Sequence, residues 1–231
     1  MRVIAIIPSA GLGRRIESSL KGKKSYLPKQ FLKISGKEIL IHTIEKFEQA
    51  DFIDEILISS GREYLDHTSK LISKYKLKKV TTIVTGGEER QHSVYNAFKN
   101  SYASPSDLIC VHDAVRPFIS SIEINELILS AKKFKSIVAA VKASDTIKSG
   151  HSFVEKTLDR NKIWLVQTPQ IFSYEILRKA FNRAWEQNFI GTDEASIVER
   201  IGRPVYFYEI KGENRKITTN LDLEYANFLL K

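Results

Sequence analysis

Glycine and arginine residues gather directly after the first apolar run of the chain. The stretch IIPSAGLGRR begins in the apolar run Val3–Ile7, breaks at Pro8, and turns through Gly11 and Gly13 before two arginines. Glycines after a strand let the backbone approach a ligand closely, and free N–H groups at such a turn favour an anion. The glycines alone are equally compatible with a tight surface turn.

Two familiar phosphate-binding motifs do not fit this turn. A dinucleotide-binding fingerprint needs a third glycine where the chain has Ile16, and also an acidic residue about 20 residues further on. A Walker A loop needs the pattern G-x-x-x-x-G-K-[ST], which the sequence lacks. Both nucleotide-binding motifs are therefore excluded.

The charge around the turn indicates the kind of ligand. Between Arg14 and Lys29 the chain has six basic residues and a single acidic one, Glu17, which gives +5 out of a net charge of +9 for the whole chain. A basic cluster beside a glycine turn favours a small polyphosphate, whereas a diffuse basic surface would favour nucleic acid. A small ligand is the better interpretation.

Polar clusters also follow later apolar runs. GGEERQHS (Gly86–Ser93) and VHDAVRP (Val111–Pro117) come after two of them, and the second places Asp113 near Arg116. In open α/β sheets, ligands bind at the carboxyl ends of the strands. A carboxylate such as Asp113 suits Mg²⁺ that also binds phosphate oxygens. Each cluster alone could be a helix cap or a loop ion pair, but their convergence at one sheet edge favours a ligand site.

The catalytic motifs that the sequence lacks limit the class of reaction. The sequence shows no nucleophile elbow, no metal-binding histidine pair and no Cys–His candidate. Phosphoryl and nucleotidyl transfer need none of these, because positioning and charge neutralisation supply most of the catalysis. An attacking phosphate is already ionised near neutral pH and needs no general base. The available arginines, lysine, glycine amides and aspartate suffice for such a transfer.

The elements that must position these residues alternate between strands and helices. Strand-like runs occur at Val3–Ile7, Glu55–Ser59, Thr81–Val84, Leu108–Val111, Ile137–Val141 and Val205–Ile210. Helical spacing of apolar residues separates them, at Leu40–Phe47, Val94–Phe98, Ile124–Ala131, Leu177–Ala184 and Leu221–Leu230. This alternation predicts an α/β fold with a mainly parallel sheet covered by helices on both faces. No repeat or linker is evident, so we expect a single domain over residues 1–231.

One segment interrupts the alternation. From Ala143 to Leu165, short β-like stretches flank Ser149-Gly150-His151, as in a hairpin that projects from the body of the domain. The segment could be a surface excursion or an arm that reaches a partner subunit. The sequence pattern alone leaves both interpretations of residues 143–165 open.

Composition indicates a protein of a reducing, aqueous compartment. A hydrophobic content of 42% supports a core, and no apolar run approaches the ~20 residues of a membrane span. No signal peptide opens the chain, and the single cysteine, Cys110, excludes an internal disulfide framework. We therefore expect a cytoplasmic protein with no membrane partner, and Cys110 as a buried strand residue.

Seven motifs in order resemble a known family. The stretches PSAGLGRR…PKQF, GGEERQHSV, VHDAVRPF, DTIK, LDRNKIWLVQTPQIF, TDEAS and NRKIT are similar to those of the 2-C-methyl-D-erythritol 4-phosphate cytidylyltransferases of the non-mevalonate isoprenoid pathway. The resemblance extends from Val3 to the closing helix. It implies a Rossmann-like nucleotidyltransferase fold, a Mg²⁺-dependent homodimer, and transfer of a cytidylyl group from CTP to methylerythritol phosphate with release of pyrophosphate. We also expect no fused downstream enzyme after Lys231.

The resemblance implies which residues bind the nucleotide. The residues that would wrap the triphosphate are Ala10, Gly11, Gly13 and Arg15. Arg15 and Lys29 would be catalytic, because they would neutralise the charge that builds on the α-phosphorus. Those that would read the cytosine edge are Gly87, Glu88 and Ser93.

The resemblance also implies which residues bind the methylerythritol phosphate. Asp113 and Arg116 would face this substrate, and Asp113 would also bind Mg²⁺. The residues that would hold the substrate's phosphate and hydroxyls are Thr146, Arg160, Thr192 and Lys216. In this family the arm crosses a homodimer, so the resemblance implies that residues 143–165 are a projecting dimerisation arm. It would place Thr146 and Arg160 in the neighbouring active site.

The stretch IESSLKGKKSYLP, residues 16–28, is longer than this family leads us to expect. It could be a solvated mobile loop, which we favour, or a lid over the triphosphate.

Two alternative functions remain. A ribitol 5-phosphate cytidylyltransferase shares the fold and the CTP site, but SAGLGRR and the GTDEAS stretch at Gly191–Ser196 favour the first assignment. A basic nucleic-acid-binding module would account for the charge of +9, and it predicts steeply salt-dependent DNA or RNA affinity. We expect no nucleic-acid partner.

Overall fold

The computed structural model describes residues 1–11 and 27–230 of the chain. The predicted residues Gly13 and Arg15, and most of the 16–28 loop, lie outside this range. The strands of the main sheet are β1 (Val3–Ser9), β4 (Glu55–Ser60), β5 (Val80–Thr85), β6 (Leu108–Val111), β7 (Ser136–Lys142), β10 (Trp164–Ser173) and β11 (Tyr206–Glu209). The described helices are α2 (Ile39–Glu48), α3 (Leu65–Lys74), α4 (Arg90–Lys99), α5 (Ser121–Phe134), α6 (Tyr174–Glu186), α7 (Glu194–Glu199) and α8 (Asn220–Leu229).

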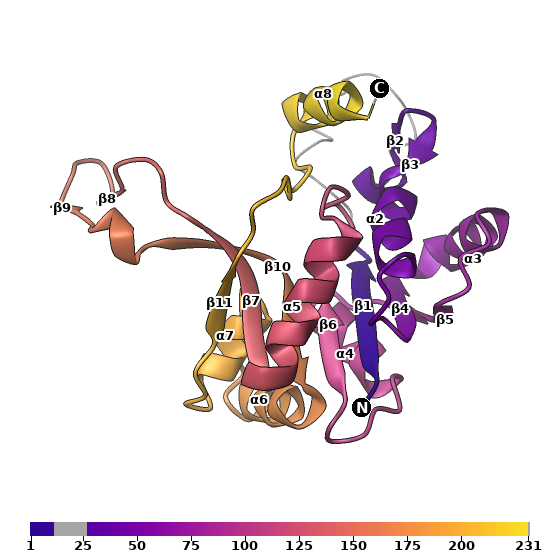
Figure 1. The fold of residues 1–231 in the computed structure, drawn as a ribbon, viewed down its shortest axis with the longest axis horizontal. Helices are drawn as coiled ribbons and strands as arrows, with labels where there is room; N and C mark the ends of the chain where they lie inside the picture. Colours follow the sequence, from indigo (N-terminus) through magenta and orange to yellow (C-terminus); the bar gives the residue numbers. More distant parts are fainter. Residues whose placement is uncertain (12–26, 231) are drawn as a thin grey trace.

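One seven-stranded sheet forms the centre of the molecule, in the order β11-β7-β10-β6-β1-β4-β5 (Figure 1). Neighbouring strands from β6 to β5 pair in parallel, and β11 pairs in parallel with β7. Only β10 runs antiparallel to both of its neighbours. The predicted α/β class with a mainly parallel sheet is confirmed.

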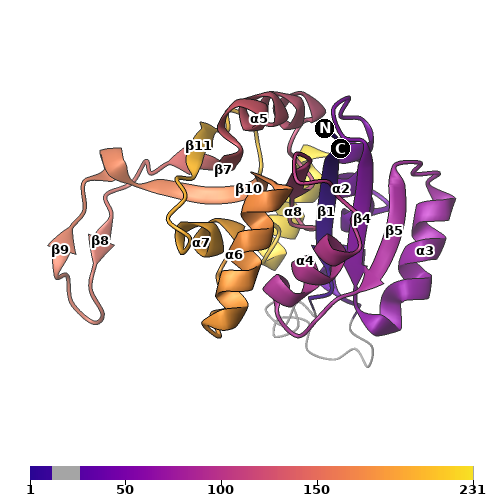
Figure 2. The same ribbon diagram turned by 90° about the horizontal axis from the view of Figure 1, so that it is seen from below.

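The sheet is covered on both faces, as the continuous apolar strands predict. In β1, the side chains of Val3, Ala5 and Ile7 join one core cluster, and those of Ile4 and Ile6 join the other. Helices α2, α3 and α5 supply the first cluster, whereas α4, α6 and α7 supply the second (Figure 2). Cys110 is fully buried in β6, and burial raises the pKa of its thiol, as expected for an inert core residue.

Two details of the strands differ from the sequence-based expectation. Pro8 does not end the first strand, because β1 continues to Ser9. Pairing with β6 ends at Ile6, so at Pro8 the strand faces only β4, through Ser59, and tolerates a residue without an N–H group. The antiparallel strand β10 was not predicted, although its residues belong to the quoted motif LDRNKIWLVQTPQIF.

The segment between β7 and β10 projects from the body of the sheet. It contains a short antiparallel pair, β8 (Lys148–Ser149) and β9 (Lys156–Thr157), which extends away from the body of the sheet (Figures 1 and 2). A second small pair, β2 (Lys33–Ile34) with β3 (Lys37–Glu38), packs near α8. Among the described residues, none of the helices combines the length and apolar character needed to cross a membrane.

The strand order places a ligand site between β1 and β6. The chain passes from β1 outward to β4 and β5, and then returns to the other side of β1 to form β6. Such a change of direction leaves a crevice at the carboxyl ends of the two central strands, where open α/β sheets bind ligands. The segments that follow β1, β5 and β6 carry the predicted site residues.

Candidate functional site

The glycine turn after β1 is held by a buried glutamine. Gln30 donates from Nε2 to the carbonyl oxygens of Ser9 at 2.7 Å and Gly11 at 3.2 Å. Gln30 lies in a 3-10 turn, Lys29–Phe31, so the same turn places the half-buried Lys29 beside the start of the glycine segment. Gln30 belongs to the PKQF motif, but residue type and spacing alone do not predict its role.

The GGEERQHS segment approaches the same turn closely. A methyl group at Gly86 would collide with Cβ of Ala10, and one at Gly87 would collide with Cβ of His92, so the backbone path requires glycine at both positions. Ser93 Oγ accepts a hydrogen bond from the Gly87 amide at 3.0 Å. Ser93 therefore shapes this loop, and the side chain of Glu88 is exposed on it.

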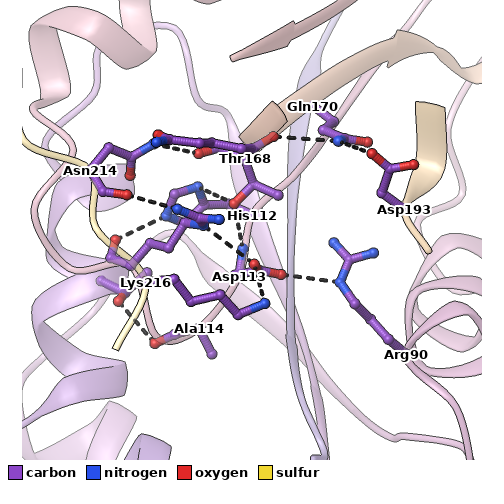
Figure 3. A network of polar contacts seen from close by, with 12 residues as sticks. Arg90, His112, Asp113, Ala114, Thr168, Gln170, Asp193, Asn214 and Lys216 are labelled. Carbon is purple, nitrogen blue, oxygen red and sulfur yellow. Dashed lines mark hydrogen bonds and ion pairs between the residues drawn. The ribbon is translucent and has the colours of Figure 1, made fainter. Parts of the chain in front are cut away.

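Three cations surround the buried carboxylate of Asp113 (Figure 3). Arg90 Nε lies 3.1 Å from Oδ1, while Lys216 Nζ and Arg116 Nε lie 2.8 and 3.4 Å from Oδ2. Burial alone would raise the pKa of the Asp113 carboxyl, but the charges of Arg90, Lys216 and Arg116 outweigh it and hold the pKa well below the ordinary aspartate range. Asp113 is therefore ionised at any physiological pH.

Arg90 also binds a second buried carboxylate. Its Nη1 lies 2.7 and 2.9 Å from the two carboxylate oxygens of Glu194, at the start of α7. Burial opposes the charge on Arg90, but the Glu194 and Asp113 carboxylates outweigh this and raise the pKa of the guanidinium. Arg90 thus joins the GGEERQHS segment to both the Asp113 turn and the TDEAS segment.

Two glutamines fix the loop that carries Thr192. Gln91 Oε1 accepts from the Gly191 amide at 2.7 Å. On the other side of Thr192, Gln170 donates to Asp193 Oδ2 at 2.7 Å and accepts from the Ala195 amide at 3.0 Å. Thr192 therefore lies in a loop that is anchored on both sides.

A basic cleft opens beside the Asp113 cluster. It has a volume of about 550 Å³, and its lining includes Arg116, Lys216, Gln167 and the segment 211–215. Two buried polar atoms near the cluster, Arg90 Nη2 and Asn214 Oδ1, have no hydrogen-bond partner among the described residues. Buried polar atoms without partners are rare in native proteins and are typical of a place where a bound ligand completes the bonding.

Asp113 is the carboxylate that was expected to bind Mg²⁺, and its surroundings can be compared with that role. Within residues 1–11 and 27–230, no group of three or more His, Cys, Asp or Glu side chains is arranged to hold a metal ion. Both oxygens of Asp113 contact cationic side chains, so a divalent ion there would meet three positive charges. This arrangement does not fit the expectation that Asp113 is a metal ligand.

The predicted site residues divide into three groups. One group lies at the carboxyl edge of the sheet, in segments that are joined by contacts of these residues or of their neighbours in the chain: Ala10, Gly11, Lys29, Gly87, Glu88, Ser93, Asp113, Arg116, Thr192 and Lys216. Thr146 and Arg160 are exposed on the arm, where Arg160 Nη1 donates to the Ser144 carbonyl at 2.9 Å. Gly13 and Arg15 lie outside the described residues.

Comparisons with known proteins agree with this geometry. The chain is 40% identical over 233 residues to 2-C-methyl-D-erythritol 4-phosphate cytidylyltransferase of Syntrophus aciditrophicus, with 100% of this chain and 96% of that one covered. It is 41% identical over 230 residues to the protein of the same name from Clostridium acetobutylicum, with 98% and 96% covered. The crystal structure of the Francisella tularensis 2-C-methyl-D-erythritol 4-phosphate cytidylyltransferase superposes with a TM-score of 0.80 at 35% identity, over 99% of both chains.

The family assignment rests on almost the whole chain. The family model for 2-C-methyl-D-erythritol 4-phosphate cytidylyltransferase matches residues 3–231. That range includes every segment that contributes to the cluster around Asp113. The chain belongs to the 2-C-methyl-D-erythritol 4-phosphate cytidylyltransferase family.

Proposed function

We propose that this enzyme transfers the cytidylyl group of CTP to 2-C-methyl-D-erythritol 4-phosphate. The products are pyrophosphate and 4-diphosphocytidyl-2-C-methyl-D-erythritol, an intermediate of the non-mevalonate isoprenoid pathway. The observation that carries the proposal is the cationic cluster of Arg90, Arg116 and Lys216 around Asp113, at the edge of the sheet where this family's motifs converge.

The reaction is an in-line displacement at phosphorus. A phosphate oxygen of methylerythritol phosphate forms a bond to the α-phosphorus of CTP, and the bond from that phosphorus to the bridging oxygen of the β-phosphate breaks. The electron pair leaves with pyrophosphate. The attacking phosphate is already an anion, so no general base is required.

Cations of the chain stabilise the transition state. Arg15 and Lys29 neutralise the charge that builds on the α-phosphoryl oxygens. The segment at Ala10 and Gly11 offers backbone amides to the triphosphate, and the family resemblance adds Gly13, which lies outside the described residues. Gly87, Glu88 and Ser93 form the loop that receives the cytosine, with Ser93 acting on Gly87 through the 3.0 Å bond that shapes the loop.

The basic cleft receives the methylerythritol phosphate. Asp113 is ionised and accepts hydrogen bonds from hydroxyl groups of this substrate. Its phosphate binds near Arg116 and Lys216, with Thr192 nearby on its anchored loop. Asp113 keeps the cations in place without cancelling their combined positive charge.

A second copy of the chain completes the site. The arm exposes large apolar side chains, with Phe153 71% and Val154 61% accessible, and Leu165 and Val166 at the start of β10 are exposed as well. Burial of such a surface against a second copy is favourable. We infer a homodimer in which Thr146 and Arg160 of one chain contribute to the active site of the other.

The remaining expectations concern the metal ion, the cellular location and the partners of the enzyme. Mg²⁺ stays a prediction from the family resemblance, and the proposal needs no contact between Asp113 and a metal ion. We also propose that the enzyme acts in the cytoplasm, without a membrane or nucleic-acid partner.

The test is pyrophosphate release from CTP, with methylerythritol phosphate and ribitol 5-phosphate offered in parallel. We expect turnover with methylerythritol phosphate. Equal or faster turnover with ribitol 5-phosphate would overturn the assignment. A gel-shift assay at physiological salt provides an independent check, because a nucleic-acid-binding protein would retard DNA or RNA and release no pyrophosphate.

A further inference from the structure

One glutamine of α4 contacts the loop that carries Thr192. Gln91 is the second residue of α4, within the segment GGEERQHS, and it is only 4% exposed. Its Oε1 accepts a hydrogen bond from the Gly191 amide at 2.7 Å, and its Nε2 donates to the Phe189 carbonyl at 3.1 Å. Both ends of the side-chain amide therefore bind backbone atoms that lie 98 and 100 positions further along the chain.

These two hydrogen bonds hold the backbone directly before Thr192. A methyl group at Gly191 would collide with Oγ of Ser196, so the loop folds tightly against the start of α7. Thr192 itself is exposed, so its side chain can meet a ligand while the backbone before it is fixed. Gln91 therefore acts on the residue of this loop that the family resemblance assigns to the substrate.

The contacts on the other side of Thr192 come from different side chains. Gln170 of β10 donates to the Asp193 carboxylate (Figure 3), and Arg90 binds the carboxylate of Glu194. Both contacts end on residues that follow Thr192 in the chain. They do not replace the two hydrogen bonds that Gln91 makes before it.

We propose that Gln91 is a positioning residue for methylerythritol phosphate, which acts by placing Thr192 beside this substrate. The inference rests on the proposed function. Gln91 lies in the same segment as Gly87, Glu88 and Ser93, the residues proposed to receive the cytosine. Its side chain, however, bonds to the loop before Thr192. Loss of these bonds therefore weakens binding of methylerythritol phosphate much more than binding of CTP.

The test compares Gln91→Met, Thr192→Val and the double variant. Gln91→Met keeps the length of the side chain but removes both hydrogen-bonding groups, and Thr192→Val keeps the shape but removes the hydroxyl. If Gln91 acts through Thr192, the two losses do not add in the double variant. Gln187→Met is the control, because Gln187 is an exposed glutamine two residues before Phe189, where it accepts from Arg200 Nε at 2.8 Å.

We expect Gln91→Met to raise KM for methylerythritol phosphate at least about fivefold, with KM for CTP changed less than about twofold. In the double variant, this KM should exceed that of the more impaired single variant by less than about twofold. Gln187→Met should keep both parental KM values. Parental KM values in Gln91→Met or in Thr192→Val, an equal rise of both KM values in Gln91→Met, or effects that multiply in the double variant would overturn the positioning role.

A measurement on the parent separates this inference from the proposed function and does not depend on how well the variants fold. Hydrogen exchange at the Gly191 amide reports whether its bond to Gln91 is formed in solution. We expect protection of this amide in the parent and loss of protection in Gln91→Met. Exchange in the parent at the rate of an unstructured chain would overturn the positioning role alone. A parent that fails to turn over methylerythritol phosphate would overturn the proposed function, and the positioning role with it.

Discussion

Arg90 and Glu194 form a two-point ion pair between residues that are 104 positions apart in the chain. Arg90 Nη1 lies 2.7 and 2.9 Å from the two carboxylate oxygens of Glu194, whose side chain is only 2% exposed. The same guanidinium holds Asp113 through Nε. One cation therefore compensates two buried carboxylates, one beside the substrate cleft and one at the start of α7.

Removal of Arg90 is expected to destabilise the fold because it leaves Glu194 buried without a counterion. We expect Arg90→Leu to lower the free energy of unfolding by about 3 kcal/mol. The double variant Arg90→Leu/Glu194→Gln should recover part of that loss, because the uncompensated charge is gone. Urea unfolding of the single and double variants measures the coupling.

The control is Arg178→Leu, which breaks the exposed pair between Arg178 and Glu175 on α6 and should leave stability unchanged. The prediction is wrong if the double variant loses as much free energy of unfolding as Arg90→Leu and Glu194→Gln lose together as single variants. In that case the two side chains do not stabilise one another.

The central parallel strands β1 and β6 are predictable from sequence because each is apolar on both faces. Val3–Ile7 and Leu108–Val111 read as continuous apolar runs, and both are confirmed as the buried strands β1 and β6. Strand β10 is different: its exposed first half and its proline give no such run. The antiparallel direction of β10 follows from the long arm before it, which a local pattern does not reveal.

Only those site residues whose type is conspicuous at their place in the sequence are predictable. Asp113 is conspicuous in the sequence because it is an acidic residue only two positions after a buried strand. Arg90 and Glu194 lie in quoted motifs, but a charged residue there looks like solvated surface until the fold brings the two together. Gln91 and Gln30 act through hydrogen bonds to backbone atoms of other loops, and such partners leave no trace in residue spacing.

His112 is expected to make stability depend on pH in the mildly acidic range. Its ring is fully buried, and burial lowers its pKa to about 4 in the folded protein, whereas the pKa is about 6.5 in an unfolded chain. Between these values the unfolded state binds more protons, so stability is fully present above about pH 6.5 and falls as the pH drops towards 4. The difference amounts to at most about 3 kcal/mol.

Urea unfolding of the parent and of His112→Gln across this range measures the effect. The free energy of unfolding of the parent should fall more steeply with decreasing pH than that of His112→Gln. His151→Gln, at an exposed position of the arm, is the control and should keep the parental slope. Parallel curves for the parent and His112→Gln would contradict a buried neutral His112.

The last prediction is that each active site is built from two chains. Arg160 is exposed and donates to Ser144 within the arm, and the arm extends away from β1 and β6 (Figures 1 and 2). In one chain, Arg160 is therefore separated from the Asp113 cluster. We expect Lys29→Ala to lower kcat at least about 100-fold through loss of a transition-state cation, and Arg160→Ala to be nearly inactive through loss of substrate binding in the neighbouring site.

Mixing the two inactive variants distinguishes a shared site from a site within one chain. In a mixed dimer, one site combines the intact Lys29 of one chain with the intact Arg160 of the other, while the second site carries both substitutions. Random exchange at equal amounts makes about half of the dimers mixed, each with one good site, so activity should rise to roughly a quarter of the parental value. Native mass spectrometry confirms that subunits have exchanged. If exchange is complete and activity stays at the level of the separate variants, Arg160 serves its own chain and the shared site is wrong.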